Sequence, residues 1–187
     1  MIKSFLAKVF ILSLLPLLAC ASPPSWKIIP GESTLTFTGI QNGAPATGKF
    51  THFTGEISFD PAALNASSVK IIVDTTSVSA SYKDMVDTLK TADWFNVKLF
   101  PQAIFTASQF RKTGDKSYEA MGNLTIRDKT NPVTITFNVL EQSDNRAKVK
   151  GSTTIKRNAF GVGQGEWSST DAVRNEVTVD FVLSVEK

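Results

Sequence analysis

Apolar and polar residues alternate with a period of two through most of this 187-residue chain. In one run, Val133, Ile135 and Phe137 alternate with Thr134 and Thr136. Successive side chains of a β-strand point to opposite faces, so each such run predicts a strand with one apolar face. The predicted strands are 26–29, 33–39, 46–53, 56–59, 69–73, 102–110, 118–126, 133–139, 147–157 and 177–185.

Short turn sequences, rather than linkers, separate these runs. Asn42-Gly43 is the strongest turn signal, and a bulge or tight turn is expected around Thr54-Gly55, between two of the runs. A long antiparallel series of about eight strands or more usually closes into a barrel, because closure removes exposed edges. We therefore predict an all-β fold, an extended eight-stranded antiparallel barrel, in one domain over residues 22–187.

One stretch follows a helical period instead. Four apolar residues have the spacing i, i+3, i+4 and i+7 and so share one helix face: Tyr82, Met85, Val86 and Leu89. Ser81, with Asp84 three residues later, resembles a capping box and predicts that the helix begins there. Pro101 lacks an amide hydrogen and disfavours helix in the preceding residue, so the helix should end earlier. The barrel is thus expected to carry a short helical insertion.

Residues 1–21 are predicted to be a secretory signal peptide and not part of the fold. Lys3 and Lys8 accompany an apolar run over 9–18, and the small residues Ala19-Cys20-Ala21 follow. The apolar run is short for a membrane span, and no later stretch is long enough either. The mature protein is expected to be soluble and exported.

Two processing sites fit this segment. Ala19-Cys20-Ala21 satisfies the small-x-small rule, and the mature chain would then begin at Ser22. Alternatively, Leu17-Leu18-Ala19-Cys20 resembles a bacterial lipobox, in which Cys20 would be lipidated and would anchor the domain to a membrane face. Leu18 is a less usual residue at its position, which favours simple cleavage.

Composition argues against several functions. Cys20 is the only cysteine, so no disulfide can form within the chain and a cysteine metal site is excluded. Removal of residues 1–21 takes away two lysines and no acid, which lowers the formal net charge from +3 to +1. So small a charge gives no support for nucleic-acid binding.

Candidate catalytic residues are few and scattered. His52 is the only histidine, which excludes a multi-histidine metal site and restricts a Ser-His triad to one position. Glu32, Glu56 and Asp60 lie at expected turns or strand ends, where acidic residues are common. The glycine-rich run 161–165 lacks the Lys-Ser/Thr pair of a phosphate-binding loop and fits a flexible loop at a barrel mouth better. We predict that the protein is not an enzyme and holds no metal.

Aromatic residues are the remaining distinctive feature. Of 13 phenylalanines only Phe5 and Phe10 lie in the signal peptide, and the mature chain also has Trp26, Trp94 and Trp167. An eight-stranded barrel is wide enough to be filled by side chains or to hold one small ligand. The aromatic content fits both a filled barrel and an elongated apolar cavity, and the sequence does not separate them.

Several motifs resemble the signature of the YceI-like family of bacterial polyisoprenoid-binding proteins. In chain order they are 48–50, 53–61, 68–78, 89–97, 100–105, 122–126 and 157–161. The resemblance covers the whole mature chain, and it is similar in particular to the branch found beside or fused to cytochrome b561 proteins. Members of the family often carry a histidine-serine pair where this chain has Glu32-Ser33, and another histidine near Gln41-Asn42.

The resemblance implies a lipocalin-like barrel with the helix packed at one end and a long isoprenoid chain inside. The ligand would be a polyisoprenoid or a ubiquinone-type quinone, and no cofactor would be covalently bound. The protein would be a periplasmic carrier, store or sensor, as a monomer or homodimer. Alternatively, it would be an accessory subunit or partner of a membrane cytochrome b561 in quinone-linked electron transfer.

On this hypothesis, nine apolar side chains are expected to form the cavity wall. They are Phe37, Phe50, Trp94, Phe95, Phe105, Leu124, Phe137, Phe160 and Phe181. Trp94, Phe95 and Phe160 are expected to close one end of the barrel, and the other six to point inward from strands.

Overall fold

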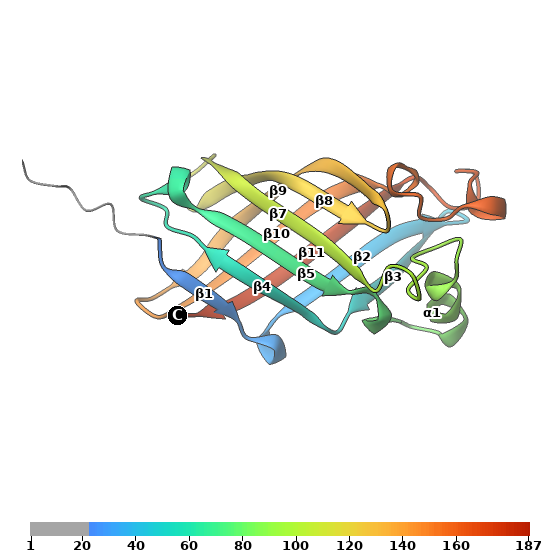
Figure 1. Cartoon of the computed structure of the whole chain (residues 1–187), viewed down its shortest axis with the longest axis horizontal. Helices are drawn as coiled ribbons and strands as arrows, with labels where there is room; N and C mark the ends of the chain where they lie inside the picture. The colour runs from blue at the N-terminus through green and yellow to red at the C-terminus, as the bar shows by residue number, and fades with distance from the viewer. Residues whose placement is uncertain (1–22) are drawn as a thin grey trace, which may run out of the picture.

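The alternating runs form eleven strands in the computed structural model, which describes residues 23–187 (Figure 1). The strands are β1 (Ser25–Ile28), β2 (Thr34–Gln41), β3 (Ala44–Phe50), β4 (Phe53–Ser58), β5 (Ser68–Asp74), β6 (Val78–Ala80), β7 (Gln102–Lys112), β8 (Ser117–Ile126), β9 (Lys129–Gln142), β10 (Arg146–Lys156) and β11 (Glu176–Glu186). All of them belong to one antiparallel sheet. The signal-peptide prediction for residues 1–21, including Cys20, lies outside the described residues.

Eight of these strands close into a ring. Neighbours pair in the order β1-β4-β5-β7-β8-β9-β10-β11, and β11 pairs again with β1 at Lys27–Glu186 and Ile28–Val185. β2 pairs with β11 further along, so β1 and β2 follow one another beside the same strand. In the same way, β3 and β4 share one place in the ring and β5 and β6 share the next, because β3 pairs with β2, and β6 pairs with β3. The predicted eight-stranded antiparallel barrel is confirmed, and short breaks in its first strands explain the larger strand count.

One of these breaks lies elsewhere than predicted. The interruption expected around Thr54-Gly55 is instead at Thr51-His52, between β3 and β4, and Gly55 lies inside β4. A Cβ atom at Gly55 would lie 2.7 Å from Ile71 Cδ1 and 2.8 Å from Ile28 Cδ1. The glycine therefore marks close packing against these two isoleucines and not a turn.

The helical insertion is α1 (Lys83–Lys90), beside β6. The prediction that Ser81 caps this helix is wrong, because the N-cap residue is Tyr82, whose backbone is still extended and whose side chain makes no capping hydrogen bond. The helix ends at Lys90, well before Pro101, as predicted. Leu89 on the apolar face is buried, whereas Tyr82 is 55% exposed.

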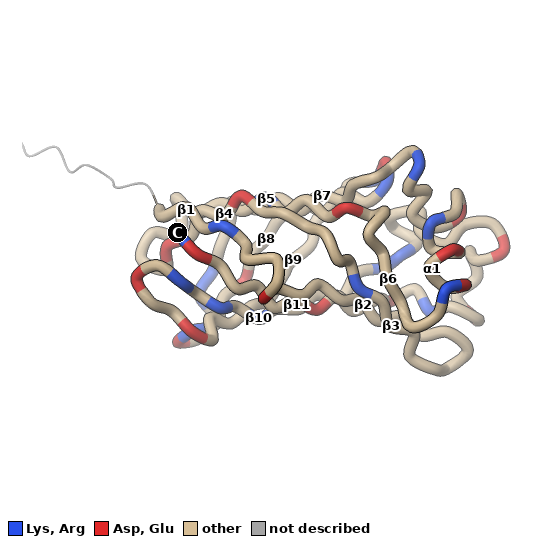
Figure 2. The backbone as a smooth tube through the Cα atoms, turned by 90° about the horizontal axis from the view of Figure 1, so that it is seen from below, with Lys and Arg blue, Asp and Glu red and all other residues tan. Residues whose placement is uncertain are grey.

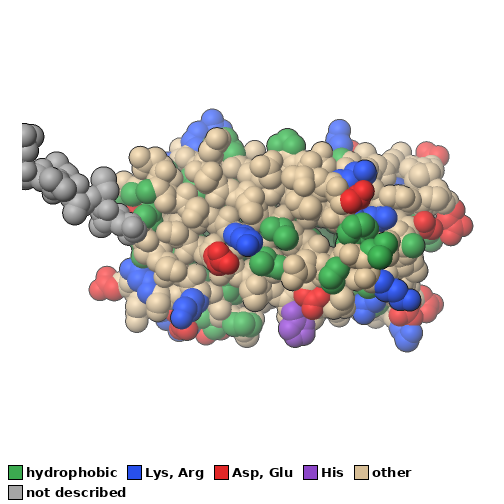
Figure 3. Space-filling model, viewed as in Figure 1, with side chains coloured by type: hydrophobic (Ala, Val, Ile, Leu, Met, Phe, Trp, Pro, Cys, Tyr) green, Lys and Arg blue, Asp and Glu red, His purple; other side chains and the backbone are tan. Residues whose placement is uncertain are grey.

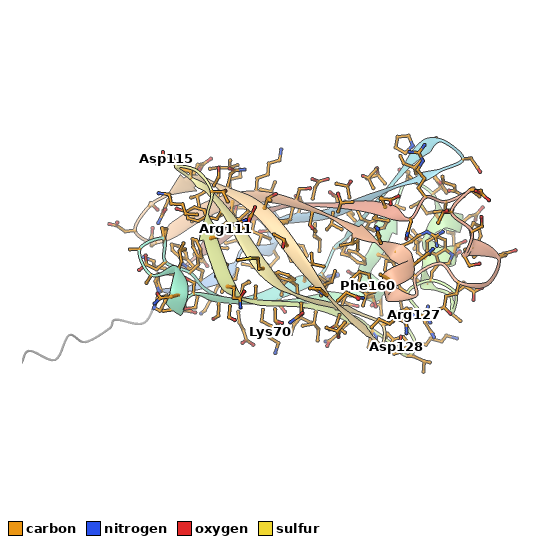
Figure 4. All side chains as sticks on the ribbon, turned by 90° about the horizontal axis from the view of Figure 1, so that it is seen from above. Lys70, Arg111, Asp115, Arg127, Asp128 and Phe160 are labelled. Carbon is orange, nitrogen blue, oxygen red and sulfur yellow. The ribbon has the colours of Figure 1, made fainter. Side chains whose placement is uncertain are left out.

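The two ends of the barrel differ in construction (Figure 1). The helix end carries α1, residues 91–101, the β8–β9 turn and the long connection 157–175 between β10 and β11. The opposite end carries the tight β7–β8 and β9–β10 connections, β1 and the end of β11. In Figure 4, Arg127 and Phe160 lie toward the helix end, and Asp115 lies at the opposite end.

Charged residues of both signs are interspersed over the outside of the barrel. Figure 2 shows lysine and arginine positions interspersed with aspartate and glutamate positions along the strands and connections. On the face seen in Figure 3, apolar side chains emerge in small separate groups among polar ones. The long apolar face of each strand must therefore be turned inward.

Buried apolar side chains form two clusters. The helix-end cluster consists of Phe37, Val78, Leu89, Trp94, Ala103, Ile126, Phe160, Val162 and Val173. The opposite-end cluster consists of Phe105, Ala107, Tyr118, Ala120, Phe137 and Val139. Leu124 and Val133 are partly buried and pack against both clusters, so they lie where the two halves of the interior meet.

Candidate functional site

A cavity of about 480 Å³ occupies the barrel interior. Its wall includes Leu89 and Trp167 at the helix end and Trp26 and Val185 at the opposite end. The space therefore extends along the barrel between the two clusters. The sequence fits both a filled and a hollow barrel, and the structure shows a hollow one.

The alternation of residue types explains why the wall is apolar. From β11, five inward positions reach the cavity: Val177, Val179, Phe181, Leu183 and Val185. Four of β9 do the same: Val133, Ile135, Phe137 and Val139. The residues between those of β9, such as Thr134 and Thr136, are exposed. A register shift of one residue would turn polar side chains into the cavity. The burial of the apolar side chains therefore fixes the register of each strand.

All nine residues expected from the sequence lie on the cavity wall. Phe37, Trp94 and Phe160 belong to the helix-end cluster, and Phe50, Phe95 and Leu124 pack against it. Phe105 and Phe137 belong to the opposite-end cluster, and Phe181 packs against that one. Their contact with a ligand stays a prediction.

The aromatic rings form one group at each end of the cavity. At the helix end, the ring centroids of Phe37 and Phe50 are 5.4 Å apart, and those of Phe50 and Phe95 are 5.6 Å apart. At the opposite end, Phe59 is the centre of a group, with ring centroids 5.4 to 5.6 Å from Phe110, Tyr118 and Phe137. Tilted and edge-on pairs at these distances attract beyond their buried area. The sequence analysis missed Phe59 and Phe110, although their spacing within strand runs was available as a signal.

Arg157 is the least expected residue on the wall, because it is only 2% exposed and has no carboxylate partner within residues 23–187. Its three guanidinium nitrogens donate instead to backbone carbonyl oxygens at 2.7 to 3.1 Å, those of Val162, Gly163, Trp167, Ser169, Val173 and Arg174. Burial lowers the pKa of the guanidinium from its ordinary value. Carbonyl dipoles thus compensate the buried cation.

This arginine fixes the long connection between β10 and β11. The six carbonyls all belong to residues 162–174, which would otherwise leave backbone acceptors unpaired inside the molecule. The amides of Gly163 and Gln164 both donate to the Asp93 carbonyl at 2.8 Å, which joins the connection to the segment after α1. Residues 91–101 and 157–175 together form a cap on the helix end of the barrel. The glycine-rich run, predicted to be a flexible mouth loop, is a hydrogen-bonded part of this cap.

Trp94 joins these two segments through its ring. The Arg157 guanidinium lies 5.8 Å from its ring centroid, and the Trp167 ring centroid lies 5.5 Å away at a steep angle. The indole Nε1 of Trp94 is buried without a hydrogen-bond partner among the described residues. Arg127 supports the same segment from outside by donating to the carbonyls of Ala92 and Trp94.

Polar side chains are rare on the wall and gather mainly at the helix end. They are Gln41, Tyr82, Asp84, Thr88, Gln142, Thr153 and Arg157. Four of these come from the end of β2 and from α1 with its N-cap, whereas Gln142 alone represents the opposite end. Asp84 is exposed, and it borders the cavity together with Thr88, one turn further along α1.

The residues considered for catalysis do not converge. Glu32 pairs with Arg146 at 2.8 Å, and the Asp60 carboxylate accepts the Ala62 amide at 2.8 Å. His52 is exposed, and its Nδ1 lies 3.1 Å from the Thr51 hydroxyl. Within residues 23–187, no three His, Cys, Asp or Glu side chains are grouped so that they could hold a metal ion. No described helix has the length and apolarity needed to cross a membrane.

Proteins of known structure share this barrel. BcnA of Burkholderia cenocepacia is 33% identical, with a TM-score of 0.80 over 84% of this chain and 98% of that one. A polyisoprenoid binding domain from Saccharophagus degradans, implicated in plant cell wall breakdown, has a TM-score of 0.69 over 86% and 97% of the two chains. The latter is only 17% identical, so it supports the fold alone.

Sequence relatives agree with the structural ones. A UPF0312 protein of Pseudomonas aeruginosa is 33% identical over 74% of this chain and 72% of its own length. Protein YceI of Salmonella arizonae is 31% identical over the same shares. The model of the YceI-like domain matches residues 26–185, from the first strand to the last. On this evidence the chain belongs to the YceI-like family.

Proposed function

We propose that the protein binds a long apolar lipid of the polyisoprenoid or isoprenoid-quinone type within its barrel, as a carrier, store or sensor. The observation that carries this proposal is the cavity of about 480 Å³, whose wall is apolar from one end to the other except for a few side chains. A binding function requires a shaped apolar space and no catalytic group, which agrees with the dispersed positions of Glu32, Asp60 and His52.

The shape of the cavity favours a chain over a compact ligand. Phenyl rings at both ends and aliphatic side chains between them offer a methyl-branched chain contact along its whole length. Each methylene group that leaves water for such a wall contributes roughly 0.8 kcal/mol. The protein would then keep in solution a lipid that does not dissolve in water by itself.

The first experiment is mass spectrometry of an organic-solvent extract from protein purified without detergent from its own host. A prenyl species in stoichiometric amount is the expected result. An empty extract from a folded, monodisperse sample would contradict the proposal and would indicate that the cavity serves another purpose.

A variant pair tests whether the wall is the binding surface. Phe105→Glu places a carboxylate on the wall, and Thr106→Glu places the same group one residue further along β7, at an exposed position. We expect the first variant to lose the lipid and the second to keep it, with both folded by circular dichroism. Retention by a folded Phe105→Glu variant would exclude this wall as the site.

Cellular location and protein partner are further parts of the proposal that come from the family resemblance. We propose that the protein is periplasmic, either soluble after cleavage between Ala21 and Ser22 or anchored to a membrane through Cys20. A membrane cytochrome b561 is the proposed partner. Fractionation of the host with mass analysis of the mature N-terminus tests the first point, and co-purification of a haem protein tests the second.

A further inference from the structure

The cavity wall carries two formal charges, and they are not equivalent. Asp84 and Arg157 are the charged residues among those that line it, and both lie at the helix end. Arg157 is 2% exposed, and its three nitrogens already donate to six carbonyl oxygens. A guanidinium has five N–H donors, so Arg157 has none left for a ligand.

Asp84, in contrast, is exposed, and its carboxylate oxygens can still accept hydrogen bonds from a ligand. It lies in the first turn of α1, and its carboxylate has no ion-pair partner among the described residues. The neighbouring Lys83 points elsewhere, because it pairs with Asp87 and its side chain is 83% exposed. Around Asp84, the wall adds only uncharged polar groups: the Gln41 amide and the hydroxyls of Tyr82 and Thr88.

We propose that this cavity accepts lipids with an uncharged, oxygen-bearing headgroup, such as an alcohol, phenol or quinone, and rejects their phosphorylated forms. The inference depends on the proposed lipid-binding function and specifies the ligand class. A lipid hydroxyl at the helix end can donate to the Asp84 carboxylate and bond to the amide and hydroxyls there, whereas a quinone carbonyl can accept from the amide and the hydroxyls. A phosphate there would meet the Asp84 carboxylate and find no available cation among the residues that line the cavity.

A cation near the opposite end is the strongest argument against this reading. The Lys187 ammonium lies 4.8 Å from the centroid of the Trp26 ring, which lines the cavity. Lys187 itself does not border the cavity, and Glu186 beside it adds a negative charge. The only polar wall residue at that end is the uncharged Gln142. We therefore expect no phosphate preference there either.

The test compares geranylgeraniol with geranylgeranyl phosphate, which share one chain and differ in headgroup charge. Trp94 and Trp167 line the cavity, so quenching of their fluorescence reports binding by the purified protein. We expect the alcohol to bind at least about tenfold more tightly than the phosphate. Asp84→Lys should reduce this ratio severalfold, chiefly by tightening phosphate binding.

Glu176→Lys is the matched control, because it makes the same charge change at an exposed position at the start of β11, outside the cavity wall and with no ion pair to break among the described residues. It should leave the ratio near that of the natural protein. Equal affinities for the two lipids, with no response to Asp84→Lys, would overturn this inference while leaving lipid binding intact. If phosphate binds well and Lys187→Gln abolishes that binding, the inference is overturned and the headgroup belongs at the opposite end. Binding of neither lipid would overturn the proposed function itself.

Discussion

The helix end and the opposite end of the barrel enclose the same cavity by different means. At the opposite end, the strands run into tight hairpins, and the packed rings around Phe59 line the cavity. At the helix end, the long connections 91–101 and 157–175 cross the barrel, and their backbone groups need partners. Arg157 supplies many of these partners from a single side chain. Paired strands satisfy the hydrogen-bonding groups of each other's backbone, whereas irregular connections also need partners from side chains.

This difference predicts that loss of a polar side chain destabilises the helix end most, and that loss of an apolar side chain destabilises the opposite end most. The predictions below test it, beginning with the largest expected effect.

Arg157→Met should lower the free energy of unfolding by about 3–5 kcal/mol, because it leaves buried carbonyl oxygens without donors. Urea unfolding followed by fluorescence measures the change. Arg146→Met is the control, since Arg146 pairs with Glu32 at the surface, where both side chains are 53% exposed, and such a pair contributes about 1 kcal/mol at most. Similar losses in the two variants would show that the cap does not depend on its buried arginine.

Phe137→Ala should destabilise the opposite end by about 3 kcal/mol, near the lower limit for a buried phenylalanine, because its ring already borders a cavity. The ring contacts Phe59 and Tyr118. Leu140→Ala on the same strand is the control, and its 46% exposed side chain should matter by less than about 0.5 kcal/mol. Thermal unfolding of both variants gives the comparison. An equal effect of the two would mean that the aromatic group does not hold this end.

Gly163→Ala should cost about 1–3 kcal/mol more than Gly43→Ala. Both glycines have positive φ, 77° and 79°, so the backbone strain of an added Cβ is similar. At Gly163 that Cβ would overlap the Arg157 guanidinium, whereas at Gly43 it would meet nothing within 4 Å. The difference in unfolding free energy isolates the contact with the arginine. No difference would show that the cap adjusts freely around it.

Ala120→Leu should have the smallest effect on stability and should be the variant that best distinguishes a usable cavity from a packed core. Ala120 borders the cavity and is 4% exposed. Leucine can extend into the empty space, so we expect the ligand-free protein to gain up to about 1 kcal/mol while lipid retention falls. A loss of about 1–3 kcal/mol would instead indicate overpacking and a smaller cavity. Met121→Leu, whose side chain does not border the cavity, is the control for both measurements.

The sequence predicted the regular parts of this molecule well and the irregular parts poorly. The alternation in β9 and β11 is a local property, and it correctly predicted strands and inward positions such as Phe137 and Phe181. The start of α1 was misplaced by the Ser81 pattern, because the chain continues from β6 in extended form through Tyr82. The role of Arg157 had no local signal, because its six acceptors come from a connection whose path only the fold decides.

The sequence by itself determined that this chain forms a barrel of amphipathic strands with an apolar interior, since side-chain alternation follows from the backbone geometry of each strand. Only the tertiary structure decided that the interior is hollow, that Arg157 holds the cap and that Asp84 borders the cavity. Each of these depends on distances between residues far apart in the chain. Ring closure, packing and charge pairing fix those distances, and none of the three is encoded in a short stretch of sequence.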